Sequence, residues 1–263
     1  MPTAPPVTAM SQTKTEYIQS PFDLPRIPCR MQVVGRSNSG KSTLISSIIQ
    51  HQYKGVWEKI YIFSSTVNVD PMWKALTEHI RETLGQIRDI KDINDIAIAH
   101  DKVDETAIRK ILAQSESSIK RQQQEGKKKC KSTLLIFDDL SHTKELNKHA
   151  AGLMGELFTT SRHFGVSLIA SVHSISSLGS LPRRQLSCLI LFPDSNRRSY
   201  EAMAEQYSRL AGHDKKTFDE IYDLALGKNA PPYSFLTINV NETPGRIFML
   251  RFSHFIVPIS DGA

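Results

Sequence analysis

The chain has 263 residues, 40% of them hydrophobic and 23% charged, with a formal net charge of +6. This length and apolar content allow one α/β domain with a substantial core. The longest uninterrupted apolar runs, such as Leu134–Phe137 and Cys188–Phe192, are too short to cross a bilayer, and residues 1–28 show no signal-peptide pattern. The three scattered cysteines exclude a disulfide framework and favour a reducing intracellular compartment.

The order of predicted elements follows the apolar patterns along the chain. Residues 1–25 are rich in proline and predict an extended arm. Strands and helices then alternate: strand Cys29–Val34, helix Lys41–Tyr53, strand Lys59–Ser64, a helix starting at Pro71 with Asp70 as its N-cap, helix Asp104–Gln123, a strand at Leu134–Leu140, helix Glu145–His163, strands Val166–Val172 and Leu189–Phe192, and helices Ser199–Leu210 and Lys215–Leu226. The pattern is ambiguous over residues 84–100. At the C-terminus, Tyr233–Val240 and Arg246–Phe252 predict a β-hairpin added to the sheet edge.

Residues 35–42, Gly-Arg-Ser-Asn-Ser-Gly-Lys-Ser, match the spacing of a phosphate-binding loop between a strand and a helix. Glycines let the backbone turn tightly and aim its N–H groups inward, and the positive end of the following helix favours a polyphosphate. Lys41 would reach the β- and γ-phosphates, and the Ser42 hydroxyl would hold Mg²⁺. The predicted nucleotide contacts are Gly35, Arg36, Ser37, Asn38, Ser39, Gly40, Lys41, Ser42 and Thr43.

The apolar run Leu134–Phe137 is followed at once by two carboxylates, Asp138 and Asp139. Such a run is typical of a strand buried on both faces, and ligands bind at the carboxyl ends of strands in open α/β sheets. We expect Asp138 to hold Mg²⁺ through water and Asp139 to polarise the attacking water as a general base. The alternative, an acidic turn that merely ends a strand, loses weight beside the phosphate-binding loop.

Strands alternating with helices predict an α/β fold with a mainly parallel sheet flanked by helices. The long span between Lys41 and Asp138 suits the P-loop ATPases in which an additional strand separates the phosphate-loop strand from the acidic strand. We therefore expect an N-terminal arm over residues 1–28 and a single P-loop ATPase domain over residues 29–263, with a C-terminal β-hairpin.

The basic side chains crowd between Lys120 and Lys131, opposed only by Glu125. This run is either a solvated loop or a loop that contacts nucleic-acid phosphates, and its Arg121–Lys131 part is predicted to be a flexible connection. The pairs Arg183-Arg184 and Arg197-Arg198 carry the same two alternatives.

Several segments, taken together, resemble a known family: GRSNSGKST (35–43), IYIFSS (60–65), LLIFDDL (134–140), LFTTSRHFGVSLIASVHS (157–174) and LPRRQLSCLILF (181–192). Their order is similar to that in the genome-packaging ATPases of large DNA viruses, the poxvirus-type members of the FtsK–HerA superfamily. The resemblance implies an additional-strand core that uses ATP and Mg²⁺. It also implies a homo-oligomeric ring, a pentamer or hexamer, that translocates double-stranded DNA and works with capsid or portal-vertex proteins. Its place would be the cytoplasm or nucleus of an infected cell, or the virion.

The same resemblance implies roles for residues outside the two motifs. Arg162 matches an arginine that can stabilise charge on the transferring phosphoryl group, with helix-dipole complementation as the alternative. His173 occupies the position of the family's usual sensor amide, with Ser171 or Ser174 as substitutes. The alternative for His173 is a structural histidine at the end of a strand. Arg184 is a second finger candidate, and Glu156 is a reserve acid with a surface role as its alternative.

Two other functions remain open on sequence alone. A small-molecule kinase of the P-loop class would need a lid and an acceptor pocket, and no arginine-rich lid of the usual kind is visible. A nucleotide-binding assembly protein would bind through Lys41 without turnover. A GTPase is disfavoured because Asn147-Lys148-His149-Ala150 lacks the guanine-reading aspartate.

Overall fold

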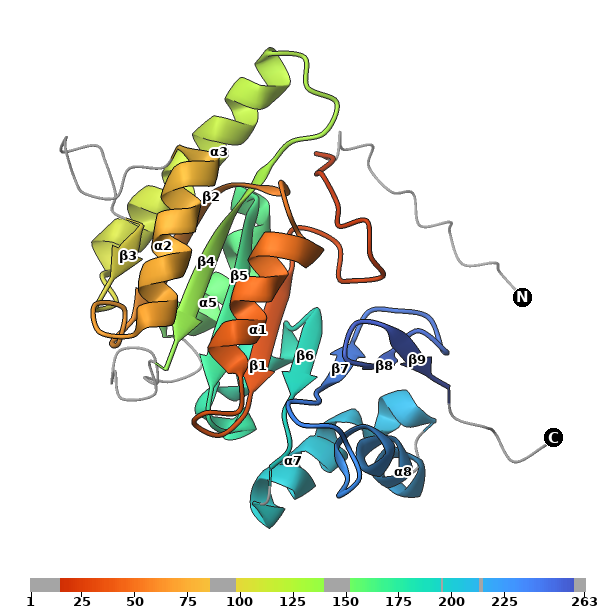
Figure 1. Ribbon diagram of the computed structural model, residues 1–263. Helices are drawn as coiled ribbons and strands as arrows, with labels where there is room; N and C mark the ends of the chain where they lie inside the picture. The colour runs from red at the N-terminus through yellow and green to blue at the C-terminus, as the bar shows by residue number, and fades with distance from the viewer. Residues whose placement is uncertain (1–14, 86–97, 140–151, 195, 213–214, 258–263) are drawn as a thin grey trace, which may run out of the picture.

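The computed structural model describes residues 15–85, 98–139, 152–194, 196–212 and 215–257. They form a nine-stranded sheet in the order β3-β2-β4-β5-β1-β6-β7-β8-β9 (Figure 1). The strands are β1 (Arg30–Val34), β2 (Trp57–Ser64), β3 (Ala99–His100), β4 (Ser132–Asp138), β5 (Val166–Val172), β6 (Cys188–Leu191), β7 (Leu236–Asn239), β8 (Phe248–Leu250) and β9 (His254–Ile256).

The helices connect these strands in the alternating pattern that the sequence predicts. They are α1 (Lys41–Ser47), η1 (Ile48–Gln52), α2 (Pro71–Leu84), α3 (Glu105–Gln124), α5 (Leu153–Thr160), η2 (Ser161–Phe164), η3 (Ile175–Ser177), α6 (Ser180–Arg184), α7 (Arg197–Tyr207), η4 (Ser208–Ala211) and α8 (Lys215–Leu226). Among the described helices, none combines the length and apolar character that a bilayer crossing requires.

The sheet is parallel from β3 through β6 and antiparallel from β6 through β9. β5 lies between β1 and β4, so the predicted additional strand between the phosphate-loop strand and the acidic strand is confirmed. The predicted C-terminal hairpin is confirmed as β7–β8, and β9 extends it. We call the side at which the parallel strands finish the carboxyl end of the sheet, and the side at which they begin the amino end.

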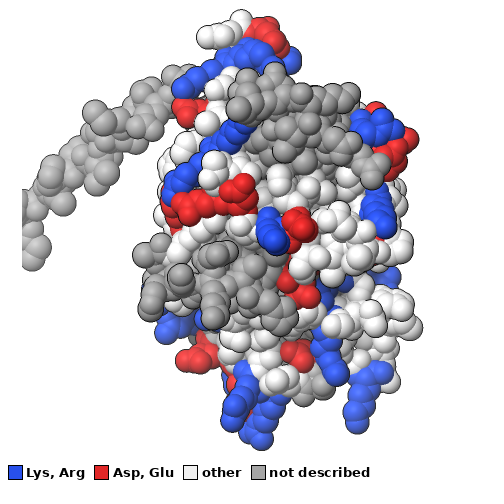
Figure 2. Space-filling view, turned by 90° about the vertical axis from the view of Figure 1, so that its left-hand side faces the viewer, with Lys and Arg blue, Asp and Glu red and all other residues white. Residues whose placement is uncertain are grey.

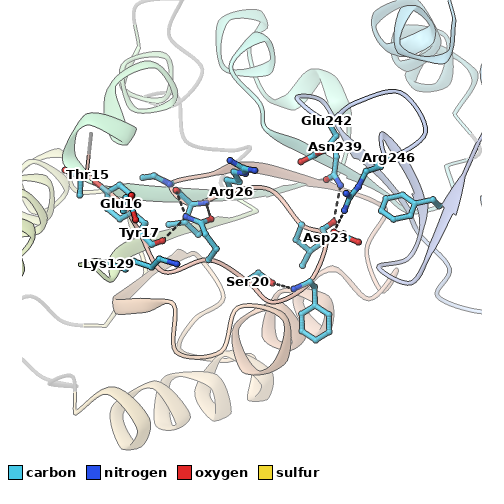
Figure 3. A pocket seen from close by; sticks show the side chains of 16 residues that line it. Thr15, Glu16, Tyr17, Ser20, Asp23, Arg26, Lys129, Asn239, Glu242 and Arg246 are labelled. Carbon is cyan, nitrogen blue, oxygen red and sulfur yellow. Dashed lines mark hydrogen bonds and ion pairs between the residues drawn. The ribbon is translucent and has the colours of Figure 1, made fainter. Parts of the chain in front are cut away.

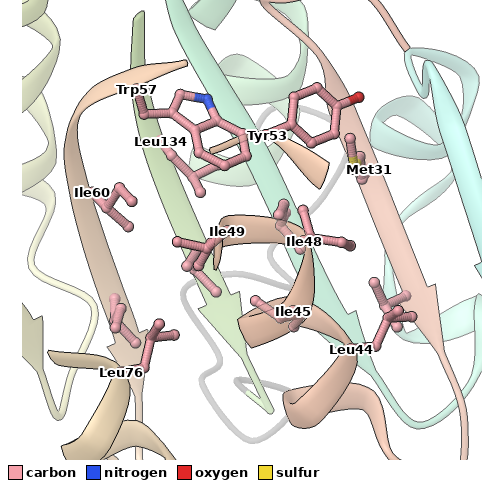
Figure 4. Close-up of a cluster of buried hydrophobic side chains, with 14 of the residues drawn as sticks. Met31, Leu44, Ile45, Ile48, Ile49, Tyr53, Trp57, Ile60, Leu76 and Leu134 are labelled. Atoms are coloured by element: carbon pink, nitrogen blue, oxygen red, sulfur yellow. The ribbon is translucent and has the colours of Figure 1, made fainter. Parts of the chain in front are cut away.

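Alternate residues of the central strands pack against helices on opposite faces. On β4, Leu134 and Ile136 belong to the cluster with α1, η1 and α2, while Leu135 and Phe137 belong to the cluster with α3 and α5. Figure 4 shows the first of these clusters, in which α1 and η1 lie across the strands. A third cluster joins α7 and α8 to the antiparallel strands, as their position beside β7 in Figure 1 suggests.

Side-chain caps explain where the two long helices begin. Asp70 accepts a hydrogen bond from the backbone N–H of Met72 at 2.8 Å, and Pro71 occupies the first position of α2. Asp104 caps α3 in the same way through Thr106, at 2.9 Å. Because these side chains satisfy donors that a helix leaves unpaired, both predicted helix starts are confirmed.

The N-terminal segment 15–28 packs on the domain and forms backbone hydrogen bonds with the basic loop, residues 125–131. The Cys130 backbone N–H donates to Glu16 O at 2.9 Å, and the Cys130 carbonyl accepts from Ile18 N at 2.9 Å. Helix α3 also continues to Gln124. The prediction of a flexible connection over Arg121–Lys131 is therefore wrong at both ends, because the helix enters it and backbone pairing closes it.

Other predictions are met in part or fall outside the described residues. The predicted helix Glu145–His163 is seen as α5 followed by η2, and residues 145–151 lie outside the described residues. Residues 86–97 of the ambiguous stretch lie outside as well. The three cysteines, Cys29, Cys130 and Cys188, are free and buried, which agrees with the expected absence of a disulfide framework.

Candidate functional site

The loop between β1 and α1 has the backbone of a phosphate cradle. Gly40 has φ +98° and forms the N-cap of α1, and Asn38 has φ +60°. A Cβ at Gly35 would lie 2.5 Å from Ser39 Oγ and 2.8 Å from Phe192 Cβ, so a side chain cannot fit there. The two motif glycines are thus required, one for a close approach and the other for a left-handed turn.

Lys41 is buried within this loop, and only 7% of it is exposed. Its Nζ donates hydrogen bonds to the carbonyl oxygens of Gly35 at 2.8 Å and Arg36 at 2.9 Å. Burial lowers the pKa of Lys41, and the charges of Asp138 and Asp139 oppose that shift. The ammonium group therefore lies in the electrostatic field of both carboxylates, and the two sequence motifs meet in one place.

Asp138 ends β4 and is 5% exposed. Its Oδ2 accepts hydrogen bonds from Trp73 Nε1 at 3.0 Å and from Ser64 Oγ at 3.2 Å. Burial raises the pKa of Asp138, and hydrogen bonds to its carboxylate oppose the rise. The group is thus a buried carboxylate oriented by neutral donors.

Asp139 follows β4 in a left-handed conformation, with φ +48°. Its backbone N–H donates to Ser171 O at 3.1 Å, which ties it to β5. Its Oδ1 lies 2.9 Å from Nε2 of His173, which follows β5 directly. Asp139 and His173 therefore meet at the carboxyl end of the sheet, and Ser171 is buried beside them. Ser174 instead caps η3 by accepting from Ser176 N at 3.4 Å.

The two finger candidates lie elsewhere. Arg162 is in η2 just before β5 begins, and Arg184 ends α6 shortly before β6 begins, so both are at the amino end. The charge of Arg162 lowers the pKa of Arg30 at the start of β1, after the larger effect of burial. The structure therefore does not bring Arg162 or Arg184 to Lys41 of the same chain. Glu156 is an exposed residue of α5 whose carboxylate lies 3.2 Å from the Arg109 guanidinium.

A cavity of about 680 Å³ opens beside the loop and the first turn of α1. The Phe192, Tyr233 and Phe235 rings line one side, and Asp70 and Met72 at the start of α2 also line it. Tyr233 is 70% exposed, and its Cδ1 would lie 3.3 Å from a Cβ built on Gly40. This arrangement suits a nucleoside, whose base can stack on an aromatic ring while its phosphates reach the loop.

The donor set fits a magnesium ion only if a ligand completes it. Among the described residues, no group of three or more His, Cys, Asp or Glu side chains is placed to hold a metal. The Asp138 carboxylate and the Ser42 hydroxyl are oxygen ligands of the kind that Mg²⁺ prefers, and this ion commonly shares its coordination with substrate phosphates and water. The residues present therefore fit a metal that arrives with a nucleotide.

The model of the poxvirus A32 protein family matches residues 20–222. The chain belongs to the poxvirus A32 family. The matched range contains the phosphate-binding loop, both acidic residues, Arg162 and His173, and it ends before Tyr233. The resemblance predicted from sequence is confirmed at the level of the family. No protein with curated annotation matches the chain.

Solved structures share the fold of this A32-family chain. The genome packaging NTPase B204 from Sulfolobus turreted icosahedral virus 2, in complex with AMP, has a TM-score of 0.54 and 19% identity over 84% of this chain and 96% of B204. The ATP-gammaS complex of that NTPase has a TM-score of 0.54 and 18% identity, over 85% of this chain and 96% of the NTPase. B204, the DNA-packaging ATPase from Sulfolobus Turreted Icosahedral Virus, has a TM-score of 0.55 and 16% identity, over 85% of this chain and 97% of that ATPase. The predicted P-loop ATPase fold is thereby confirmed.

A second cavity of the A32-family chain, of about 750 Å³, lies between the N-terminal segment and the turn after β7. Figure 3 shows Asp23 paired with Arg246 at its wall, with Glu16, Arg26 and Lys129 also lining it. Because acidic and basic groups alternate here, this cavity does not have the single sign of a phosphate site.

Charge on the α2 and α3 side of the A32-family chain is mixed. Figure 2 shows acidic and basic side chains next to one another over much of this face. On α2, Arg81 pairs with Glu78 at 2.5 Å, and on α3 Lys120 pairs with Glu116 at 2.6 Å. Lys127 in the basic loop lies 2.9 Å from Glu125. The loop precedes β4 and is thus at the amino end, away from Lys41 (Figure 1).

Side chains that the sequence analysis missed also line this site. Trp73, on α2, reaches Asp138, and Tyr233, Phe192 and Phe235 line the cavity beside the loop. No spacing rule identifies them, because the contacts join segments that are far apart in the chain. A lone aromatic residue in a helix is read as core, and Trp73 is indeed fully buried.

Proposed function

We propose that this A32-family chain is an ATP-hydrolysing motor that translocates double-stranded DNA and packages a viral genome into a capsid. The observation that carries the proposal is the meeting of Lys41, Asp138 and Asp139 at the carboxyl end of the sheet, on a fold shared with DNA-packaging ATPases. Lys41 is held by carbonyl oxygens that a triphosphate would replace. The family assignment supports the viral context.

ATP would enter with its phosphates in the loop and its base against the aromatic side of the cavity. Backbone N–H groups of residues 35–43 and the Lys41 ammonium would bind the phosphates. Tyr233 would provide the face on which the base stacks, since its ring is exposed and lies close to Gly40.

Ser42 and Asp138 would hold Mg²⁺ brought by the nucleotide. The ion would neutralise charge on the β- and γ-phosphates. The protein contributes orientation: Trp73 and Ser64 hold one carboxylate oxygen of Asp138, and Ser42 lies in the first turn of α1.

Asp139 would accept the proton of the attacking water. Its carboxylate contacts the His173 imidazole, which holds the side chain at the carboxyl ends of β4 and β5. His173 occupies the strand end at which a γ-phosphate would be sensed, and the imidazole can donate one hydrogen bond. A general base in this position contributes about 10²–10⁴ in rate.

Arg162 would act on the nucleotide of a neighbouring subunit. It lies at the amino end, while the nucleotide site lies at the carboxyl end, so one chain cannot supply both parts of the site. A homo-oligomeric ring, a pentamer or hexamer, would place the amino end of one subunit against the carboxyl end of the next. DNA would pass through the ring, and capsid or portal-vertex proteins would anchor it in the infected cell.

The test is the ATPase rate of the purified chain as a function of protein and double-stranded DNA concentration, with particle mass measured in parallel. A motor that completes its site across subunits shows a steep rise in specific activity as rings assemble, and further stimulation by DNA at low salt. Constant specific activity in a monomer without DNA dependence would contradict the motor and point to the kinase alternative. Nucleotide binding without turnover in any condition would point to an assembly protein.

A further inference from the structure

Trp73 makes a polar contact with an acidic residue of the candidate site. It is fully buried on α2, and its indole Nε1 donates to Asp138 Oδ2 at 3.0 Å. The two residues are separated by 65 positions in sequence. A buried indole N–H usually has a hydrogen-bond partner, and for Trp73 this partner is the acidic residue at the end of β4.

A second donor, Ser64, contacts the same oxygen of Asp138 as Trp73 does. Ser64, at the end of β2, donates to Oδ2 at 3.2 Å, and it is fully buried like Trp73. Two donors on one oxygen restrict the orientation of the carboxylate.

The other tryptophan of the chain, Trp57, serves as a comparison for the contact of Trp73. It has two tryptophans, and both are buried: Trp73 is 0% exposed and Trp57 is 2% exposed. The Trp57 Nε1 has no hydrogen-bond partner among the described residues, and its ring packs against Tyr53 at 5.1 Å between centroids. Trp57 thus contributes packing alone, whereas Trp73 contributes packing and an N–H to the acidic residue.

Helix α2 also reaches the nucleotide cavity one turn before Trp73. Asp70 and Met72, at its start, line the cavity of about 680 Å³. The same rigid helix therefore touches the space for a nucleotide and, through Trp73, the carboxylate that would serve its metal.

We propose that Trp73 is a positioning residue that, together with Ser64, orients Asp138 so that its second oxygen serves the magnesium ion of a bound nucleotide. The inference rests on the proposed function of the loop and of Asp138. It assigns to α2 a role in metal-dependent nucleotide binding, beyond its role in the core.

The experiment compares Trp73→Phe, Trp57→Phe and Ser64→Ala in the full-length chain. A fluorescent ATP analogue is titrated in EDTA and then at rising Mg²⁺ concentration, and the Mg²⁺ concentration for half-maximal enhancement of binding is recorded. Loss of an outer donor typically weakens metal affinity about 10–100-fold. We expect Trp73→Phe and Ser64→Ala to raise the required Mg²⁺ concentration about tenfold or more, with binding in EDTA changed less than about twofold. Trp57→Phe should match the unaltered chain in both measurements.

A spectroscopic readout separates orientation from packing. In Trp57→Phe the only tryptophan is Trp73, and its emission should shift when Mg²⁺ is added to the nucleotide complex. The converse variant, Trp73→Phe, should show no such shift. If Trp73→Phe loses its cooperative thermal transition, Ser64→Ala, which is a smaller change, carries the test.

The outcomes distinguish this inference from the proposed function. Equal Mg²⁺ requirements for Trp73→Phe, Ser64→Ala and Trp57→Phe would overturn the positioning role while leaving the nucleotide site intact. An equal loss of binding with and without Mg²⁺ would also overturn it, because it would show general disruption. If the unaltered chain fails to bind the analogue at any Mg²⁺ concentration, the proposed function fails first and this inference fails with it.

Discussion

The carboxyl end and the amino end of one sheet carry different chemistry in this A32-family chain. At the carboxyl end, Lys41 lies in the field of two carboxylates beside a cavity with aromatic walls. At the amino end, Arg30 and Arg162 lie close enough for their charges to interact, and Arg184 ends a short helix at the same end. In the proposed function, the carboxyl end would bind a metal–triphosphate and the amino end would supply an arginine, and the length of the strands separates the two. A head-to-tail contact between subunits, which is the geometry of a ring, would join the two.

The largest expected effect comes from removing the cation of the carboxyl end. Lys41→Ala deletes the ammonium group that would hold the β- and γ-phosphates, so nucleotide binding falls sharply and turnover drops below detection. Radioactive phosphate release and binding of a fluorescent ATP analogue measure the two effects. Lys54→Ala, which changes an exposed lysine in the same part of the chain, is the control. Normal turnover in Lys41→Ala would remove the loop from the mechanism.

Removing Arg162 at the amino end should lower the ATPase rate nearly as strongly, but without weakening nucleotide binding. Arg162→Ala should lower the rate in assembled rings by about 10³–10⁵, because the transferring phosphoryl group loses its charge partner. Binding of nucleotide to the variant should be unchanged, since Arg162 is distant from the loop of its own chain. Mixing Arg162→Ala with Lys41→Ala subunits should restore part of the activity, because each supplies what the other lacks.

The same mixing experiment with Arg184→Ala decides between the two finger candidates. Rings of mixed composition must be verified by mass before the rates are compared. If verified mixed rings of Arg162→Ala and Lys41→Ala show no ATPase activity, the amino end of one subunit does not complete the site of its neighbour. The difference between the two ends of the sheet would then not explain catalysis.

Changing one carboxylate should separate binding from turnover at the carboxyl end. Asp139→Asn keeps the shape and the contact with His173 but removes the proton acceptor, so the rate should fall about 10²–10⁴-fold with nucleotide affinity retained. Single-turnover hydrolysis, together with an equilibrium binding assay, measures both quantities. Asp101→Asn changes an exposed aspartate as the control. A rate equal to that of the unaltered chain would assign the base to another residue.

The smallest effect concerns the aromatic wall of the cavity. Tyr233→Ala should weaken ATP binding about tenfold, because stacking of a base on an aromatic ring contributes about 1–3 kcal/mol. The rate at saturating ATP should be unchanged, since the ring does not touch the phosphates. Tyr233→Phe keeps the ring and should keep the affinity. Equal affinities for the alanine and phenylalanine variants would show that the base lies elsewhere.

Much of this fold follows from local patterns. Alternating apolar strands and periodic helices predicted the parallel sheet and the helix that starts near Asp104, and the cap at Asp70 marked the start of α2. The long interval before Asp138 predicted the strand that lies between β1 and β4. These features are visible in sequence because each depends on residues that are close together in the chain.

The parts that sequence reasoning did not supply depend on distant contacts. The indole of Trp73 reaches Asp138 because α2 packs beside β2, the neighbour of β4, and a helical tryptophan predicts burial without saying where its N–H points. Tyr233 comes beside the loop because β7 pairs with β6, next to β1. The placement of Arg162 at the amino end likewise needed the strand order. Its catalytic role and that of His173 stay predictions.

The buried free cysteines can report, through their alkylation, when parts of the subunit separate. Cys29 and Cys188 lie at the centre of the sheet, with exposures of 0% and 1%, and burial raises the pKa of the Cys29 thiol to about 12. Alkylating reagents attack thiolates, so the native subunit should be almost inert toward them. Labelling of these two positions would report separation of β1 from β6, and labelling of Cys130 would report release of the N-terminal segment. The rate of alkylation during ATP turnover could therefore time which part of the subunit loosens first.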